Sequence, residues 1–243
     1  MDREKTREGA AGLVLVHGSE LGAWLWERLE AELDVPALAI DLPGRGGHAA
    51  PRRSVRLTDA VTSVIDDTIA AGMDDVVLVA HSFSGILAPA VVAGLGDRVR
   101  AVVLVGATVP MLGSSFVDLL PLTQRLLLRA MYRVRPDGLL SPAGENVKTL
   151  GNDLDEETTA WFLSRRVPEA PRLLLDPAPV ASYPDDVPVH YVRLLQDRSI
   201  SEPAREAMLT RLPDAQIHDL DAGHLPMLGQ PELLARLLEK VAA

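Results

Sequence analysis

A serine that could act as a nucleophile stands where a predicted strand turns into a helix. Residues 76–79 form a short apolar run rich in β-branched side chains, which predicts a strand buried on both faces. The small residues that follow, Ala80-His81-Ser82-Phe83-Ser84-Gly85, predict a tight turn, and a buried helix is expected from Ile86 onward. At such a turn the serine hydroxyl is exposed above the sheet, beside helix N-terminal amides that stabilise negative charge. This position suits Ser82 for nucleophilic chemistry.

The elements around this turn indicate a parallel sheet. Apolar runs predict further strands over residues 12–16, 37–40, 99–105, 187–195 and 215–220, and helical spacing predicts helices over 23–33, 57–71, 202–212 and 231–241. Alternation of strands and helices indicates βαβ units with helices on both faces of the sheet. Ligands of such sheets bind at the carboxyl ends of the strands, where this chain has Gly18, Asp41, Ser82 and Gly106.

The alternation breaks down between about residues 108 and 186, and we expect a cap over the sheet there. Helices are predicted over 116–133 and 155–166, and six prolines between 168 and 188 predict irregular structure. The cap carries three arginines spaced four apart, which predict a solvent-exposed face, and apolar residues typical of a core or a substrate wall. These are Arg125, Arg129 and Arg133, and Met111, Phe116, Met131, Tyr132, Trp161 and Phe162. We predict an N-terminal extension over residues 1–11 and one domain over residues 12–243.

Four stretches resemble, in order, the functional loops of the α/β-hydrolase superfamily. His17-Gly18 resembles the oxyanion loop, residues 80–84 the nucleophile elbow, Leu195-Gln196-Asp197 the acid loop and Gly223-His224 the histidine loop. The resemblance covers nearly all of the chain from residue 12, in the order Ser, Asp, His that this fold uses. It implies an α/β-hydrolase fold with a mostly parallel sheet of about six strands, helices on both faces, and the cap after the fourth strand.

The elbow departs from the usual G-x-S-x-G form of the superfamily. Ala80 and Ser84 occupy the glycine positions, and Gly85 comes one place late. Two roles for the Ser84 hydroxyl stay open: it forms local hydrogen bonds that alter the turn, or the residue simply replaces glycine.

The resemblance implies a Ser-His-Asp triad with an oxyanion hole. Ser82 would be the nucleophile, His224 its general base, and Asp197 the acid that orients the imidazole and stabilises the imidazolium. The backbone N–H groups of Phe83 and Ser19 would bind the oxyanion of the tetrahedral intermediate.

Other carboxylates suit the acid role less well. Asp219 and Asp221 lie too close to His224 in sequence, on the same strand and loop. Some members of the superfamily carry the acid after the preceding central strand, but residues 106–108 of this chain are Gly-Ala-Thr. Asp41 belongs to Asp-Leu-Pro-Gly, a sequence typical of turns.

The other five histidines are expected to be structural or exposed. His81, beside the nucleophile, should point away from it and pack in the interior. His17 should hold the oxyanion loop by a hydrogen bond. His48, His190 and His218 are predicted to be structural or exposed.

Residues 17–26, His-Gly-Ser-Glu-Leu-Gly-Ala-Trp-Leu-Trp, resemble the small-esterase branch that includes plant methylesterases and hydroxynitrile lyases. The lyases usually have threonine in place of this glycine and lysine directly after the catalytic histidine, whereas this chain has Gly18 and Leu225. The resemblance thus implies a serine esterase, a carboxylic ester hydrolase that cleaves small to medium apolar esters through an acyl-enzyme. Thioesters and lactones would meet the same machinery. Alternatives are a hydroxynitrile lyase-like or secondary-metabolite tailoring enzyme, a cofactor-independent oxygenase, and a non-catalytic ligand-binding homologue.

The composition of the chain excludes several classes of binding partner and reactive site. The net charge of -10 argues against nucleic acid, and the absence of cysteine excludes a thiolate nucleophile, a thiolate metal site and disulfides. No metal cluster, phosphate loop or dinucleotide motif is found, so no cofactor is expected. The charged first ten residues lack the apolar core of a signal peptide, and no apolar run approaches the roughly 18 residues that span a membrane. We expect a cytoplasmic protein with a small-molecule ester substrate and no membrane partner, and the sequence leaves a homodimer open.

Overall fold

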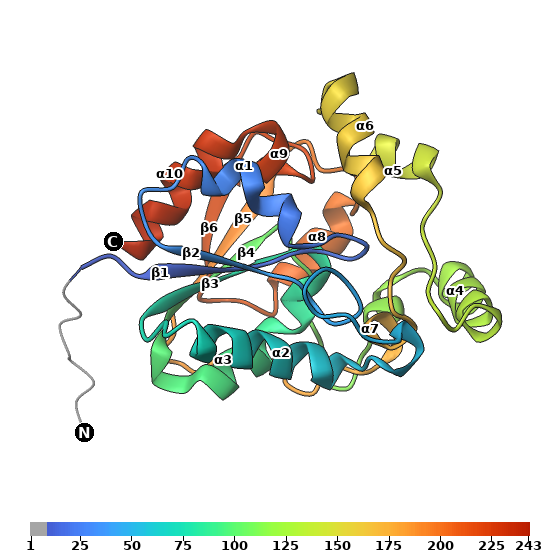
Figure 1. Ribbon diagram of the computed structural model, residues 1–243, viewed down its shortest axis with the longest axis horizontal. Coiled ribbons are helices and arrows are strands. Elements are labelled where there is room, and N and C mark those ends of the chain that lie inside the picture. The colour runs from blue at the N-terminus through green and yellow to red at the C-terminus, as the bar shows by residue number, and fades with distance from the viewer. Residues whose placement is uncertain (1–8) are drawn as a thin grey trace.

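A sheet of six parallel strands forms the centre of the protein in the computed structural model, which describes residues 9–243 (Figure 1). The order is β2-β1-β3-β4-β5-β6, and all five neighbouring pairs are parallel. The strands are β1 (Gly12–Val16), β2 (Ala37–Ile40), β3 (Val76–His81), β4 (Val99–Val105), β5 (Val189–Leu194) and β6 (Gln216–Leu220). Every residue of β1 and β3 is buried, as the continuous apolar runs predict for strands covered on both faces.

Helices cover both faces of the sheet, and alternate residues of one strand belong to different cores (Figure 1). Leu78 packs with α2 (Leu57–Ala70), α3 (Ala88–Leu95) and α8 (Glu202–Leu209). Its neighbour Val77 packs with the helices of the opposite face, which are α1 (Glu27–Glu30), α9 (Pro226–Gly229) and α10 (Pro231–Ala242). The predicted α/β class, strand order in sequence and two-sided helical cover are confirmed.

The cap lies between β4 and β5, on the side of the molecule opposite the C-terminus (Figure 1). A 3-10 turn at Phe116–Leu119 begins it, followed by α4 (Leu122–Val134), α5 (Ala143–Thr149), α6 (Glu156–Arg165) and α7 (Pro171–Leu175). The cap after the fourth strand is therefore confirmed as helical.

Two predicted helices are wrong in length. The continuous helix expected over residues 116–133 is interrupted, because Leu120 and Pro121 are extended and a proline cannot continue the hydrogen-bond ladder. The helix expected over 23–33 is a 3-10 turn, Ala23–Trp26, followed by the single turn of α1.

The cap exposes more apolar surface than its leucine-rich sequence suggests. Leu122, Leu126 and Leu127 of α4 are each more than half exposed. The expected exposed arginine face is partly paired, since Arg125 and Arg129 each lie 3.1 Å from Asp118 Oδ1. The cap residues Tyr132 and Phe162 are buried in the cores.

Of the predicted N-terminal extension, residues 1–8 lie outside the described residues. Ala11 is buried, and its N–H donates to the carbonyl of Ala242 at 2.8 Å. Within residues 9–243, no helix has both the length and the hydropathy to cross a membrane.

Candidate active site

Ser82 occupies a strained turn at the carboxyl end of β3. The strand ends at His81, a 3-10 turn over Ser82–Ile86 follows, and Ser82 has a left-handed backbone with φ 53°. Among residues 9–243, Glu20, with φ 62°, is the other non-glycine residue with positive φ. Such strain costs about 1 to 3 kcal/mol and persists where the surroundings enforce it. Here it presents the serine above the sheet.

Ser84 and Gly85 explain how the turn forms without the usual glycines. The Ser84 hydroxyl lies 2.9 Å from the carbonyl of Val16 and 2.8 Å from that of His81, so it ties the turn to β1. A Cβ on Gly85 would lie 2.2 Å from the carbonyl oxygen of Thr108. The close approach between the turn and the segment after β4 therefore requires glycine at position 85, and Ser84 forms the local bonds that the sequence left open.

The ends of three strands bring a serine, a histidine and an aspartate into one hydrogen-bonded chain. Ser82 Oγ lies 2.9 Å from His224 Nε2, and His224 Nδ1 lies 2.8 Å from Asp197 Oδ2. If Nδ1–H donates to the carboxylate, Nε2 is left to accept the serine proton. The arrangement can thus increase the nucleophilicity of a hydroxyl.

Asp197 is held as a buried carboxylate. Burial raises the pKa of Asp197, but the neighbouring His224 and the hydrogen bonds from His224 and Ser199 outweigh it, so the pKa lies below its ordinary value. The Ser199 N–H donates to Asp197 Oδ1 at 2.7 Å, and Ser199 Oγ lies 3.0 Å from His224 Nδ1. Sequence reasoning missed Ser199, although an Asp-x-Ser sequence is typical of a turn closed by the aspartate side chain.

The competing carboxylates have other partners. Asp219 pairs with Arg193 at 2.6 Å, and Asp221 accepts a hydrogen bond from the Gln196 side chain at 2.9 Å. A Cβ on Gly106, at the end of β4, would lie 3.5 Å from Asp197 Oδ2. The Asp197 carboxylate therefore lies beside the strand end that carries the acid in other members of the superfamily.

The expected oxyanion loop lies directly against Ser82. A Cβ on Gly18 would lie 3.0 Å from Ser82 Cβ, so no larger residue fits there without movement. Ser19 and Phe83 follow Gly18 and Ser82 in the chain. Their backbone N–H groups belong to the two segments that meet at the Ser82 side chain.

His17 supports this loop through both ring nitrogens. Leu42 N–H donates to Nε2 at 3.2 Å, which leaves Nδ1–H to donate to the carbonyl of Gly18 at 2.7 Å. Burial, helped by the charge of Arg45, lowers the pKa of His17 to about 4. The expected hydrogen bond from His17 is confirmed, and the ring is neutral at pH 7.

Two further residues hold the histidine loop. His81 is buried in the interior, as expected, and its Nε2 lies 2.9 Å from the carbonyl of His224. Burial and the neighbouring His224 lower the pKa of His81 to about 3. Asp153 of the cap accepts the N–H of Gly223 at 2.6 Å. Sequence reasoning missed Asp153, because this contact joins residues 70 positions apart.

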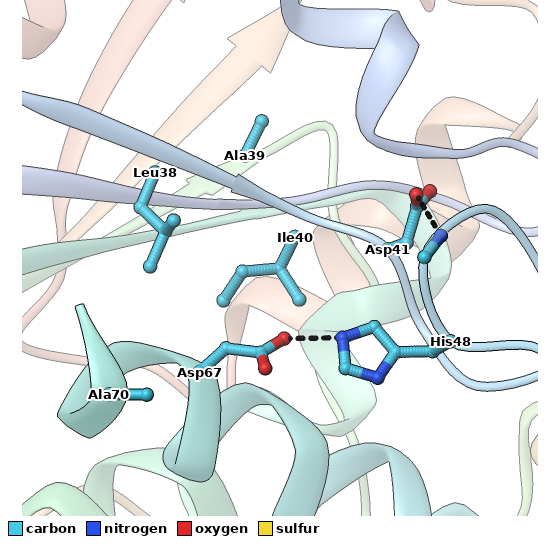
Figure 2. Close-up of a pocket in the computed structure, with 8 residues that line it drawn as sticks. Leu38, Ala39, Ile40, Asp41, His48, Asp67 and Ala70 are labelled. Atoms are coloured by element: carbon cyan, nitrogen blue, oxygen red, sulfur yellow. Dashed lines mark hydrogen bonds and ion pairs between the residues drawn. The ribbon is translucent and has the colours of Figure 1, made fainter.

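The remaining histidines lie outside this chain of bonds. His190 Nδ1 and His218 Nε2 are 2.9 Å apart in a stacked pair on β5 and β6. His48 pairs with Asp67 at 2.8 Å, in a hollow of about 300 Å³ beside the edge strand β2 (Figure 2).

That hollow offers no nucleophile. Its lining consists of Leu38, Ala39, Ile40, Asp41, Gly47, His48, Asp67 and Ala70. Asp41 is already an acceptor for the N–H groups of Ala23 and Gly47, which supports the expected turn role. A second hollow, of about 330 Å³, is lined by cap residues and by Arg198, next to Asp197. In residues 9–243, no three His, Asp or Glu side chains are grouped to hold a metal ion.

Known proteins share both the sequence pattern and the fold. A methylesterase of Arabidopsis thaliana is 24% identical over 94% of this chain and 90% of its own. A probable esterase of Oryza sativa subsp. indica is 25% identical over 97% of this chain and 98% of its own. An extracellular alpha/beta-hydrolase from a Paenibacillus species has the same fold, with a TM-score of 0.83, 21% identity and coverage of 96% and 99% of the two chains.

The model of the "Alpha/beta hydrolase family" matches residues 13–237, a span that runs from β1 to α10 and includes all three strand ends that meet at Ser82. The chain also resembles plant methylesterases, and the match to the Arabidopsis protein covers 94% of this chain. On this match, the chain belongs to the alpha/beta hydrolase family.

Proposed function

We propose that the protein is a serine esterase that cleaves a small to medium apolar carboxylic ester through an acyl-enzyme. The observation that carries the proposal is the unbroken chain of hydrogen bonds from Ser82 Oγ through His224 to Asp197. The names of the relatives, methylesterase and probable esterase, support ester hydrolysis as the reaction. Gly18 and Leu225 stand where the lyases of the related branch usually have threonine and lysine, so ester cleavage is favoured over cyanohydrin cleavage.

In this mechanism Ser82 Oγ attacks the ester carbonyl while His224 Nε2 takes the hydroxyl proton. Asp197 keeps the ring oriented and stabilises the imidazolium. The N–H groups of Ser19 and Phe83 bind the oxyanion, and each such donor typically contributes on the order of a hundredfold in rate. The leaving alkoxide takes the proton from His224. A water molecule, deprotonated by the same histidine, then attacks the acyl carbonyl, and His224 returns the proton to Ser82 Oγ as the acid leaves.

The test is hydrolysis of p-nitrophenyl esters from acetate to decanoate by the purified protein, Ser82→Ala and Ser63→Ala. Ser63 lies on α2, away from the strand ends, and is a matched serine-to-alanine control. We expect Ser82→Ala to lose at least about a thousandfold in kcat/KM while Ser63→Ala retains the activity. The preferred chain length then measures the size of the acyl site. Equal rates for Ser82→Ala and the unmodified protein would contradict the proposal.

A further inference from the structure

The residue after the proposed oxyanion donor Ser19 has a backbone conformation that the cap holds in place. Glu20 has φ 62°, in the left-handed region that glutamate rarely adopts, and its side chain is buried. An unsupported loop would relax from this conformation. The bonds that Glu20 makes therefore determine where the preceding peptide lies.

Both backbone groups of Glu20 bind residues near the end of the cap. Its N–H donates to Glu169 Oε2 at 2.7 Å, and its carbonyl accepts the N–H of Val167 at 3.0 Å. These bonds fix the orientation of the peptide groups on both sides of the Glu20 Cα.

The carboxylate of Glu20 binds the cap as well. Its Oε1 accepts the N–H and the hydroxyl of Ser141 at 2.7 and 2.6 Å. Its Oε2 accepts Nε of Arg166 at 3.1 Å and also pairs with Nη2 of that side chain. Glu20 is thus bonded on every polar group to residues about 120 to 150 positions later in the chain.

A buried ion pair completes this arrangement. Glu169 is fully buried and pairs with Arg45, which is 4% exposed. Arg45 Nη1 also donates to the carbonyl of Leu21 at 2.7 Å, and the Ala170 N–H donates to Glu169 Oε1 at 2.9 Å. One arginine-glutamate pair therefore binds the N–H of residue 20 and the carbonyl of residue 21.

Glu169 stays ionised although it is buried. Burial raises the pKa of Glu169, but the charge and hydrogen bonds of Arg45 and the Glu20 N–H outweigh burial, so its pKa lies below the ordinary value. Glu169 is accordingly an ionised acceptor, and hydrogen bonds to a charged group are stronger than neutral ones.

We propose that Arg45 and Glu169 are positioning residues that hold the Ser19 N–H in the oxyanion hole through their bonds to residues 20 and 21. This inference rests on the proposed serine hydrolase function. The pair touches neither Ser82 nor His224, so its effect passes through the loop. A donor displaced by about 1 Å loses on the order of a hundredfold in rate.

The test uses a fluorophosphonate, whose rate of reaction with Ser82 depends on the oxyanion hole and can be measured without knowing the natural substrate. Ser82 Oγ attacks phosphorus, fluoride leaves, the serine proton passes to His224, and the phosphoryl oxygen occupies the hole. The first variant, Arg45→Met/Glu169→Met, removes both charges together and so leaves no unpaired charge in the interior. The second, Arg45→Lys, keeps the positive charge but lacks the two-pronged guanidinium that binds the Leu21 carbonyl and Glu169 together. As the control, Arg100→Met/Asp75→Leu removes a partly exposed arginine-aspartate pair at the amino ends of β3 and β4.

We expect the maximal phosphonylation rate of the Arg45/Glu169 double variant to fall about ten- to a hundredfold, with less than about threefold change in the concentration for half-maximal rate. Arg45→Lys should lose a smaller factor, and the Arg100/Asp75 variant should react as the unmodified protein does. Mass spectrometry gives the rates, and thermal unfolding shows that each variant is folded. If the protein without substitutions is labelled at Ser82 and the Arg45 variants are labelled at the same rate, the positioning role is refuted and the esterase proposal stands. If the protein without substitutions is not labelled at Ser82, both the positioning role and the esterase proposal are refuted.

Discussion

Two buried neutral histidines near Ser82 should reduce the stability of the protein in mild acid. His17 and His81 are fully buried, and their pKa values are lowered to about 4 and about 3, in both cases mainly by burial. In the unfolded chain each would titrate near its ordinary pKa of about 6.5. Between these values the unfolded state binds protons that the folded state does not, so stability falls as the pH falls.

The size of the effect follows from these pKa values. Between about pH 7.5 and 5.5, each histidine is almost fully unprotonated in the folded protein and becomes about nine-tenths protonated in the unfolded chain. Each therefore reduces the free energy of unfolding by about 1.4 kcal/mol, and the two together by about 3 kcal/mol. His190 and His218 also have lowered pKa values, which adds to the loss in the same direction.

The assay is urea unfolding followed by circular dichroism at these two pH values. In His17→Gln, the free energy of unfolding should fall by only about half as much between about pH 7.5 and 5.5, because one of the two buried imidazoles is gone. Equal free energies of unfolding at both pH values would show that His17 and His81 do not remain neutral in the folded state, and the reasoning from burial would fail.

Three other substitutions test the site and the turn at Ser82. Asp197→Asn should lower kcat on the preferred ester by about 10³- to 10⁴-fold with little change in KM, because the amide no longer holds His224 in the required tautomer; an unchanged kcat would exclude Asp197 from the triad. Gly85→Ala should reduce the free energy of unfolding by about 1 to 3 kcal/mol, since the new Cβ would meet a backbone oxygen at 2.2 Å. Ser84→Ala keeps the Cβ and loses only the hydroxyl and its hydrogen bonding, at about 1 kcal/mol. Urea unfolding of the two variants gives the ranking, and the reverse order would contradict the packing argument at Gly85.

The parts of the fold that the sequence predicts are those with a strong local pattern. The β1 and β3 runs are apolar at every position, and buried parallel strands need this composition. The grouping of Ser82, Asp197 and His224 could be predicted because each follows a strand end, and the topology brings these ends together. Pro121 lies inside the helix predicted over 116–133, and the prediction did not take into account that it interrupts this helix.

The rest depends on contacts between distant segments. Nothing in the sequence around Glu20 indicates a bond to Glu169, since the two residues are 149 positions apart. The same holds for Asp153 and Gly223. The exposure of the α4 leucines was equally hidden, because periodicity predicts an apolar face but not whether another element covers it.

The bonds of Glu20 to the cap have a consequence for how the substrate range of such a protein can be redesigned. A cap taken from another protein would leave residue 20 without its partners and Arg45 without its counter-ion, unless it supplied equivalents of Ser141, Arg166 and Glu169. Cap exchange is therefore not modular here, and the loop after β1 has to be transplanted together with the new cap. Residues on the open face of α4 make no such bonds to the loop, which leaves that face free to diverge at low cost to the catalytic geometry.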